Sequence, residues 1–378
     1  MTTILTHGPG HGRRVEVLDL FCGAGGITEG LHSVTSPGGT PIYRTVGAID
    51  AWKAACETFS LNHGVRPVIA KVSEASVRQA LGGRKTVDLV AGGCPCQGFS
   101  TSGKRALDDP RNGLVLAYLE AVKFVRPRAF LFENVEGFRS FQHGALLDAV
   151  IAFAKGCGYK VSHQVVLASD HGVPQRRRRF ILVGTLDAEF HFPEPSVDQE
   201  PTFRAAVADL SEVAATNGEE IAYACDPLND FQRRMRDGAT ACTEHVAPRH
   251  SHVVTRRMSY LDEGESVMDK EVQSRKHIPT ELVPRGFPNS YRRIWWDQPA
   301  PTITRNFGTP SSANCIHPSQ PRGLTIREAA RCQSFRDTFK LVGTQSDRRL
   351  LVGNAVPPLL AEALGRALGQ HLADERWS

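Results

Sequence analysis

The sequence contains no long run of apolar residues. No stretch approaches the roughly 20 apolar residues that a membrane span needs. The first residues, MTTILTHGPGHGRR, contain no apolar segment of the length found in a signal peptide. Internal repeats and long low-complexity tracts are also absent from the sequence. We therefore expect a globular, cytoplasmic protein with no membrane partner.

Cysteine occurs in no arrangement that indicates a disulfide framework or a metal centre. The chain has nine cysteines, an odd number, and the CPC segment with Cys94 and Cys96 does not have the spacing of zinc ligands. We therefore expect no metal. In the reducing interior of a cell the thiols stay free, so one of them can serve as a nucleophile.

Positive charge is only slightly in excess. The chain has 45 Lys and Arg residues and 40 Asp and Glu residues, a formal net charge of +5. Gathered on one cleft, this excess could face the phosphates of a nucleic acid, but it is too small to prove such binding. A length of 378 residues allows a large core and favours two domains.

The first glycine-rich segment follows a predicted strand. The run Val15–Leu20 is apolar enough for a strand, and Gly23, Gly25 and Gly26 then let the backbone turn tightly and approach a ligand. A helix from about Ile27 would present its amino end to that ligand. The segment is not GxGxxG and has no P-loop lysine, which makes NAD and ATP weaker candidates.

An acid ends the second predicted strand, TVGAID. Asp50 lies about 20 residues beyond the glycines, where an acid commonly binds the ribose hydroxyls of a nucleoside cofactor. The alternative is that Asp50 caps a helix that starts at Ala51. The sequence therefore implies a nucleoside cofactor and leaves the helix cap open as another role for Asp50.

The segment GGCPCQGFSTS, residues 92–102, is the strongest candidate for a nucleophile loop. It follows the apolar run Val87–Ala91, which predicts a buried strand. Pro95 restrains the backbone immediately before Cys96, and open α/β sheets place their chemistry at the carboxyl ends of such strands. The alternative is that Cys96 is a small buried apolar residue, as free cysteines often are.

The segment RAFLFENVEGF, residues 128–138, brings an acid to the same edge of the sheet. Ala129–Phe132 predicts a central parallel strand, and Glu133 and Asn134 follow it. A glutamate behind four apolar residues is expected to be partly desolvated, which raises its pKa and lets it donate a proton. A salt bridge or a helix cap is the alternative role for Glu133.

Four consecutive arginines precede another predicted strand, Phe180–Val183. The alternation of side chains in a strand would send Arg177 and Arg179 to one face and Arg176 and Arg178 to the other. One of these pairs could face a site. We expect Arg176 and Arg178 to be solvated surface residues.

The order of the predicted elements indicates the fold class. Strands alternate with helical patterns from Val15 to Phe192, which predicts an α/β fold with a mostly parallel sheet and helices on both faces. The helical patterns lie near residues 52–61, 114–125 and 145–155. Periodicity is poor from residue 193 to about 299. Thr325 as N-cap with Glu328 at the capping-box position predicts a helix, and PPLLAEALGRALGQHLADE predicts an amphipathic helix at the end.

Several segments, in this order, resemble the motifs of the DNA cytosine-5 methyltransferases: DLFCGAGG, PCQGFS, ENV, QRRRR, PAPTITR, LTIREAARCQSF and GNAVPP. The resemblance runs from about Val15 to Leu372, apart from a variable stretch after Phe192. It implies a Rossmann-like, S-adenosylmethionine-binding catalytic domain of residues 1–192 plus 335–378. Residues 193–334 would form a target-recognition domain with its hinge.

The resemblance also implies covalent catalysis. A thiolate that adds to C6 of cytosine breaks the aromaticity of the ring and makes C5 an enamine carbon that can attack a methyl group. By resemblance Cys96 is this nucleophile, Glu133 donates to N3 and Arg179 holds O2. Asn134 belongs to the same ENV motif, and Arg177 supports the nucleophile loop or binds phosphate.

The methyl donor implied by the resemblance is S-adenosylmethionine. Its expected contacts are Asp19, Phe21, Gly23, Ala24, Gly25, Gly26, Asp50, Ala51, Pro95, Leu114, Asn354 and Ala355. Two departures from the family concern the adenine pocket. Ala51 stands where the family usually has a bulky residue, with Trp52 one place later. The stretch Lys71–Glu74 has no clear counterpart of the acid that usually meets the adenine amino group.

The implied partner is double-stranded DNA, and we expect a monomer. A cytosine inside a duplex must rotate out of the stack to reach Cys96. The expected DNA contacts are Gln97, Ser100, Ser102, Thr302, Thr304 and Arg305. Arginine commonly pairs with guanine in the major groove, and the recognition stretch contains Arg249, Arg256, Arg257, Arg275, Arg292 and Arg293. We expect most of these to be phosphate contacts or plain surface.

Two other functions stay open at this point. A branch of the family methylates transfer RNA, but there a reduced recognition stretch is expected, and this chain keeps a long one. A non-catalytic nucleic-acid-binding relative would lack the nucleophile or the ENV motif, and both are present. The leading interpretation is a sequence-specific DNA methylase of a bacterial or phage-infected cell, either the modification half of a restriction-modification system or a solitary enzyme.

Overall fold

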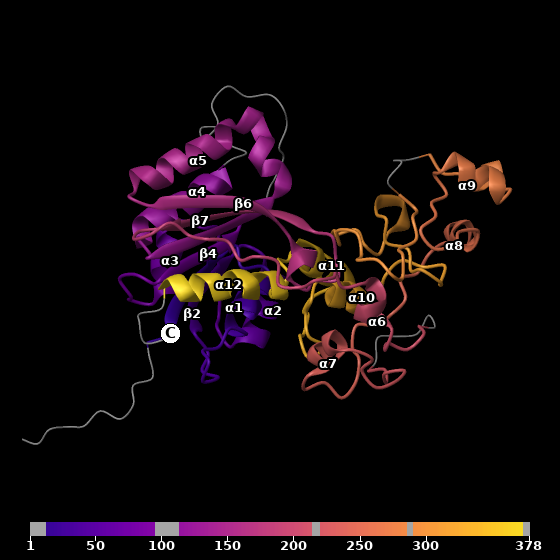
Figure 1. The fold of residues 1–378 in the computed structure, drawn as a ribbon, viewed down its shortest axis with the longest axis horizontal. Helices are drawn as coiled ribbons and strands as arrows, with labels where there is room; N and C mark the ends of the chain where they lie inside the picture. Colours follow the sequence, from indigo (N-terminus) through magenta and orange to yellow (C-terminus); the bar gives the residue numbers. More distant parts are fainter. Residues whose placement is uncertain (1–12, 95–112, 214–219, 286–289, 373–378) are drawn as a thin grey trace, which may run out of the picture.

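The computed structural model describes residues 13–94, 113–213, 220–285 and 290–372. Figure 1 shows a sheet with helices on both sides and, beside it, a part built from short helices and long connections. Helices α8 (His252–Ser259) and α9 (Lys270–Arg275) lie at the end of this second part, far from the sheet.

The strands form one seven-stranded sheet in the order β3-β2-β1-β4-β5-β7-β6. The first five strands in this order are parallel, and β7 is antiparallel to both of its neighbours. Their bounds are β1 Val15–Leu20, β2 Tyr43–Asp50, β3 Val68–Ile69, β4 Leu89–Gly93, β5 Ala129–Val135, β6 Lys160–Leu167 and β7 Arg178–Thr185. The mostly parallel α/β sheet expected from the sequence is confirmed.

Helices cover both faces of the sheet. On one face, a core cluster joins the sheet to α3 (Glu74–Leu81), α4 (Gly113–Val125) and α5 (Ala145–Gly156). On the other face, a second cluster joins it to α1 (Gly26–His32) and α12 (Pro358–Leu372). Figure 1 shows α12, the last helix, running across this face beside α1. The expected amphipathic helix at the chain end is therefore confirmed, and it packs on the first part of the chain.

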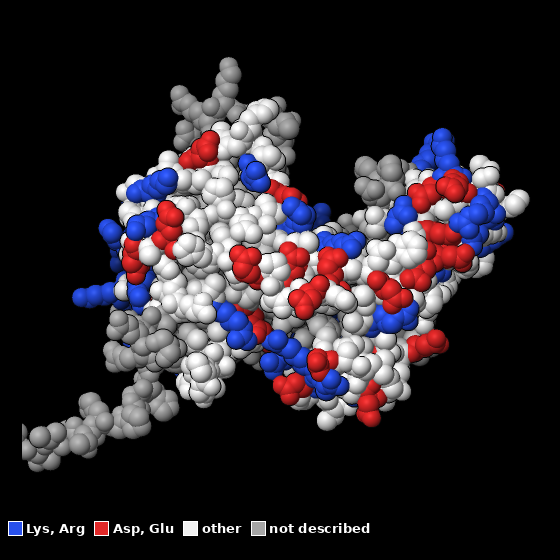
Figure 2. Space-filling model, in the orientation of Figure 1, with Lys and Arg blue, Asp and Glu red and all other residues white. Residues whose placement is uncertain are grey.

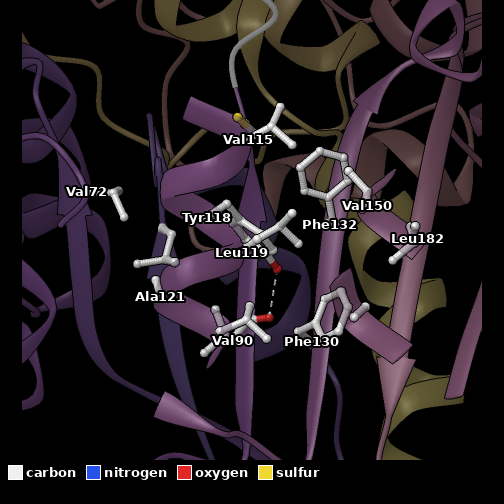
Figure 3. Close-up of a cluster of buried hydrophobic side chains, with 14 of the residues drawn as sticks. Val72, Val90, Val115, Tyr118, Leu119, Ala121, Phe130, Phe132, Val150 and Leu182 are labelled. Atoms are coloured by element: carbon white, nitrogen blue, oxygen red, sulfur yellow. Dashed lines mark hydrogen bonds between the residues drawn. The ribbon is translucent and has the colours of Figure 1, made fainter. Parts of the chain in front are cut away.

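Tyr118 anchors α4 to the centre of the sheet. Its side chain is fully buried, and its hydroxyl donates to the carbonyl oxygens of Leu131 at 2.7 Å and Val90 at 3.3 Å. Its ring packs edge-on against Phe132 and Phe130 (Figure 3). Because the one polar atom of this core side chain is bonded, its burial costs little. Tyr118 thereby links the middle strands β4 and β5 in their amino-terminal halves.

The second part of the molecule contains few regular elements. Its helices are short: α6 Phe203–Val207, α7 Asp230–Arg236, α8, α9 and α10 Ile326–Cys332, followed by α11 Gln345–Asn354. In its described residues there is no strand, only isolated bridges. Helix α10 has the predicted capping box, since Thr325 accepts from the Glu328 backbone and Glu328 accepts from the Thr325 backbone.

The strand order reverses between β1 and β4. Strands β2 and β3 lie on one side of this pair, and β5, β7 and β6 lie on the other. In open α/β sheets, ligands bind outside the carboxyl ends of the strands at such a reversal. The glycine-rich segment leaves β1 here, and β4 ends here at Gly93, so the fold places the starts of the two predicted site segments at the same edge.

Candidate active site

The loop after β1 has an unusual backbone. Phe21 has a φ of 54°, a conformation that costs a non-glycine residue energy, and Gly23 and Gly25 have φ angles of 54° and 91°. Gly25 is the N-cap of α1. Three left-handed residues within five positions reverse the chain tightly at the sheet edge. The predicted glycine turn before a helix is confirmed.

Asp50 holds this loop in place. One of its carboxylate oxygens accepts a hydrogen bond from the Gly23 backbone at 2.9 Å, and the other accepts from the Trp52 backbone at 2.8 Å. Burial raises the pKa of Asp50, while these backbone donors lower it. Helix α2 (Lys53–His63) starts two residues later than the cap alternative required, with Trp52 as its N-cap. Asp50 therefore bridges the ends of β1 and β2.

Asp19, one residue before the end of β1, is buried rather than open to the cleft. One carboxylate oxygen accepts from the Thr28 hydroxyl at 2.7 Å, and the other has no hydrogen-bond partner in the part of the chain that is described. Burial raises its pKa from the ordinary 3.8 to about 7. The sequence analysis did not identify two residues that contact this loop and its neighbour Asp19, namely Thr28 and His63. The His63 imidazole lies where a Cβ on Gly25 would be. Their positions on the inner faces of α1 and α2 carry no motif signal.

The end of the chain returns to the same loop. A Cβ on Gly26 would collide with the carbonyl oxygen of Val356, so the GNAV segment packs directly on the glycine loop. Asn354 ends α11 with an exposed side chain, and Ala355 follows it, 9% exposed. The structure thus brings Asn354 and Ala355 from the far end of the chain to the expected cofactor loop. Ala24 and Trp52 pack in a third core cluster, which also contains Leu351 and Val352 of α11.

Leu114 and Ala51 are two further residues expected to contact the cofactor. Leu114, near the start of α4, packs against the core cluster of the sheet. Ala51 is exposed. The stretch Lys71–Glu74 leads into α3, where Ser73 caps the helix in a box with Ser76 and the exposed Glu74 pairs with Arg78.

The nucleophile segment begins where β4 ends. This strand is Leu89–Gly93, so the expected end at Ala91 was too early and both glycines belong to it. Cys94, which follows, is buried. The expected residues Pro95, Cys96, Gln97, Ser100 and Ser102 lie outside the described residues.

Glu133 and Arg179 form the central pair of the site. Glu133 on β5 is 8% exposed, and its carboxylate lies 2.9 Å from Nε of Arg179 on β7. The register of the sheet places Glu133 beside Gly93 and Arg179 beside Val135. Burial raises the pKa of Glu133, and the charges of Arg179 and Arg177 partly offset this. Desolvation and a salt bridge, stated as alternatives for Glu133, therefore both apply.

Close approach of Glu133 to β4 depends on a glycine. A Cβ on Gly93 would lie 2.8 Å from the second carboxylate oxygen of Glu133. Asn134 makes a further link between the strands, since its amide donates to the Cys94 carbonyl at 3.3 Å and accepts from the Val135 backbone at 2.8 Å. Asn134 therefore connects β5 to Cys94, the residue two positions before Cys96 in the sequence.

The arginine run alternates as predicted. Arg176 and Arg178 are exposed and form ion pairs with Glu200 and Glu136. The other pair turns inward, with Arg179 at Glu133 and Arg177 1% exposed. The expectation that Arg177 could bind phosphate is wrong, because its buried guanidinium donates to backbone carbonyls of the chain instead. Its other expected role, at the nucleophile loop, falls on residues outside those described.

The PAPTITR segment lies against the arginine run. The Thr302 hydroxyl donates to the Arg176 carbonyl at 2.9 Å, while Thr304 and Arg305 are exposed. Figure 2 shows a hollow in the surface between the sheet part and the second part, with Lys and Arg side chains along it. Thr304 and Arg305 thus remain accessible for the contacts expected of them.

The structure separates the six arginines that the sequence analysis names in the recognition stretch. Arg257 and Arg293 are buried and donate to backbone carbonyls of residues 258–317. Arg275 forms an ion pair with Glu265, and Arg292 forms one with Asp269. Arg249 and Arg256 are exposed, and within the described chain neither has an ion pair or hydrogen-bond partner. Alternation and charge alone could not separate these groups.

Two classes of feature are missing from the part of the chain described. No helix there is long and apolar enough to cross a bilayer. No group of three or more His, Cys, Asp and Glu side chains among those residues is arranged to hold a metal ion.

These segments define a methyltransferase fold and site, and comparison with known proteins gives the family. The model of the C-5 cytosine-specific DNA methylases matches residues 15–370, so the chain belongs to this family of DNA (cytosine-5-)-methyltransferases. It is 31% identical to the Type II methyltransferase M.AgeI of Thalassovita gelatinovora, over 94% of this chain and 99% of that protein. It is 32% identical to the Type II methyltransferase M.DdeI of Desulfomicrobium norvegicum, over 94% and 88%.

A solved structure shows the same fold. It is a putative DNA modification methyltransferase encoded within a prophage of E. coli, with a TM-score of 0.75 and 24% identity. The match covers 94% of this chain and 98% of that one. The Rossmann-like methyltransferase architecture expected from the sequence is therefore confirmed, and methyltransferases of this kind use S-adenosylmethionine.

Proposed function

We propose that this protein transfers a methyl group from S-adenosylmethionine to C5 of a flipped-out cytosine in a specific sequence of double-stranded DNA. The observation that supports this most is the buried Glu133–Arg179 pair. It lies at the end of β5, beside the strand that leads to Cys96, in a chain of the cytosine-5 family. The pair combines one group able to donate a proton with one fixed cation, as an electron-poor base requires.

The glycine loop fits a nucleoside cofactor. A Cβ on Gly23 would meet nothing nearer than the Phe21 carbonyl oxygen at 4.0 Å, so the loop leaves room at its outer side. In this proposal Asp50 takes the ribose hydroxyls, the backbone from Phe21 to Gly26 lines the ligand, and Asn354 meets its methionine part. The bound cofactor supplies an electrophilic methyl group.

Activation of cytosine is assigned to three side chains. The Cys96 thiolate forms a bond to C6, and Glu133 in its acid form donates to N3 as negative charge develops in the ring. Arg179 holds O2. Burial of Glu133 favours its acid form, so its surroundings suit a donor better than those of an exposed glutamate.

The remaining steps restore the aromatic ring. Once C5 carries the methyl group, the C5 proton leaves to a base such as water. The bond between C6 and sulfur then breaks, which frees the Cys96 thiolate. Each bond that the nucleophile forms is thus cleaved within the same cycle, and the enzyme is regenerated.

We further propose that residues 193–334 choose the target sequence while residues 1–192 plus 335–378 carry the chemistry. The lobe around α8 and α9 has its own core cluster, separate from those of the sheet, and stands at the far side of the surface hollow. Arg249 and Arg256 are exposed and have no ion-pair or hydrogen-bond partner among the described residues, and either could contact DNA. In a bacterial cell, this activity would protect DNA as part of a restriction-modification system or act alone.

Expression in a host without DNA methylation tests the function. Bisulfite sequencing of the host DNA should show protected cytosines at one short sequence, and Cys96→Ser should abolish them. Glu133→Gln should also reduce protection strongly, whereas the matched control Glu136→Gln, an exposed residue paired with Arg178, should not. Unmodified DNA in the presence of folded wild-type protein and cofactor would contradict the proposal.

A further inference from the structure

The chain from Gln175 to Arg177 is bonded to three other segments of the protein. The Gln175 side chain donates to the Cys332 carbonyl at 3.1 Å and to the Gln333 side chain at 2.9 Å, and it accepts from the Ile303 backbone at 2.7 Å. The Arg176 backbone donates to the Ala300 carbonyl at 2.8 Å. This short stretch, just before β7, therefore meets the PAPTITR segment and α10 at once.

Arg177 makes the most concentrated of these links. Its guanidinium donates to the Ile303 carbonyl at 2.9 Å, to the Ala355 carbonyl at 2.9 Å and to the Gly353 carbonyl at 3.3 Å. The first carbonyl belongs to PAPTITR and the other two to GNAV. One buried side chain thus fixes two segments about 50 residues apart in sequence, and a planar guanidinium with several donors is the group suited to this.

The two segments that Arg177 holds also touch each other and the glycine loop. A Cβ on Gly353 would collide with the backbone of Arg305, so GNAV and PAPTITR are in direct contact. A Cβ on Gly26 would collide with the Val356 carbonyl. The 353–356 turn therefore packs against both the expected cofactor loop and the segment with the expected DNA contacts.

Burial of the Arg177 charge at this position costs free energy of folding. The residue is 1% exposed, and its Nε has no hydrogen-bond partner among the described residues. The like charge of Arg179 adds to the cost, and the opposite charge of Glu133 offsets it only in part. An apolar side chain would avoid this cost, because buried ions often add no net stability. The burial of Arg177 is therefore better explained by the positions that it fixes for PAPTITR and GNAV than by a gain in stability.

We propose that Arg177 is a positioning residue that couples cofactor binding to DNA binding by locking GNAV and PAPTITR in one arrangement. The inference rests on the proposed function, which makes one segment a cofactor contact and the other a DNA contact. In this arrangement, cofactor bound against GNAV favours the position of Thr304 and Arg305 that meets DNA, and DNA favours the cofactor in return.

Coupling between the cofactor site and the DNA site can be measured from binding affinities, without a measurement of activity. The affinity of a duplex with the methylated target sequence is determined with and without S-adenosylhomocysteine, for wild type, Arg177→Met and Arg177→Lys. In wild type the cofactor product should tighten DNA binding on the order of 10-fold, within the usual range for coupled sites. Arg177→Met should reduce that factor to about one, and Arg177→Lys, which can still donate to a carbonyl, should retain part of it.

Two further variants separate coupling from general damage. Arg176→Met, next in the chain but exposed and paired with Glu200, should leave the factor unchanged. Gly353→Ala should weaken the coupling by pushing the turn away from Arg305, and it serves if Arg177→Met fails to fold. A purely structural role of Arg177 predicts lower melting temperature and weaker binding of each ligand, with the coupling factor intact.

The outcome can be told apart from failure of the proposed function. If wild type methylates cytosine but cofactor and DNA bind independently, the inference about Arg177 is wrong and the function stands. An unchanged coupling factor in folded Arg177→Met or in Gly353→Ala also overturns it. If wild type does not methylate DNA, the proposed function fails, and the inference about Arg177 fails with it.

Discussion

Replacing Gly93 by alanine should damage catalysis although it replaces no residue assigned to the chemistry. The new methyl group would lie 2.8 Å from the Glu133 carboxylate, below the 3.4 Å of an ordinary contact. Gly93 has no left-handed φ, so alanine fits its backbone. The strain falls on the end of the Glu133 side chain, which must move by about half an ångström to restore normal contact distance.

The structure gives a rough size for the effect. Glu133 is held at 2.9 Å from Arg179, so a shift of its carboxylate also disturbs that pair. A misplacement of about 1 Å in an active site can cost roughly 100-fold in rate. Half that displacement should lower kcat about 10-fold, equivalent to roughly 1.4 kcal/mol in the barrier. The fold should survive, because the displaced atoms are the far end of one side chain.

The assay is transfer of a labelled methyl group to a duplex with the target sequence, together with thermal unfolding. Gly137→Ala is a matched control in the same region, since a Cβ there would meet no atom within 4 Å. The control should keep the wild-type rate. If folded Gly93→Ala also methylates at the wild-type rate, the position assigned to the Glu133 carboxylate in catalysis is refuted.

Other perturbations test the remaining parts of the account. Cys96→Ser should abolish turnover and leave cofactor binding largely intact, as equilibrium titration with S-adenosylhomocysteine can show. Because Glu133 must be protonated to donate and burial raises its pKa, kcat should fall as the pH rises through that pKa; a pH profile without this limb would argue against the donor. The folded-state pKa of Asp19, about 7, lies above the ordinary 3.8, so the free energy of unfolding should fall as pH rises between these values, and urea titration of Asp19→Asn should show that dependence reduced. Exchange of residues 195–292 for those of a relative should change the methylated sequence but not the reaction, and an active protein with an unchanged target would place specificity elsewhere.

Local structure was the part of the fold that the sequence predicted best. The strand Val15–Leu20 was expected with its observed bounds, because its mostly apolar residues precede the turn that begins before Gly23. The helix after Thr325 was predicted by its capping box, and the two faces of the arginine run followed from strand alternation. In each case a few neighbouring residues decide the structure.

Long-range contacts were not predictable from one sequence. Nothing near Arg177 in the chain shows that it bonds to residues 303, 353 and 355. The second part also gave little periodicity, because buried ions take the place of an apolar stripe. Arg331 on α10 is fully buried between Asp209 and Asp337, and such pairings depend on partners far away in the chain.

The covalent bond between enzyme and cytosine tests the central claim most directly. Wild-type protein is incubated with cofactor and a duplex that carries 5-fluorocytosine at the target. Fluorine cannot leave C5 as a proton does, so the adduct should persist on a denaturing gel. Peptide mapping should place the DNA on Cys96, not on the buried Cys94 two residues earlier. Absence of an adduct from protein that methylates ordinary DNA, or attachment through Cys94, would contradict the account.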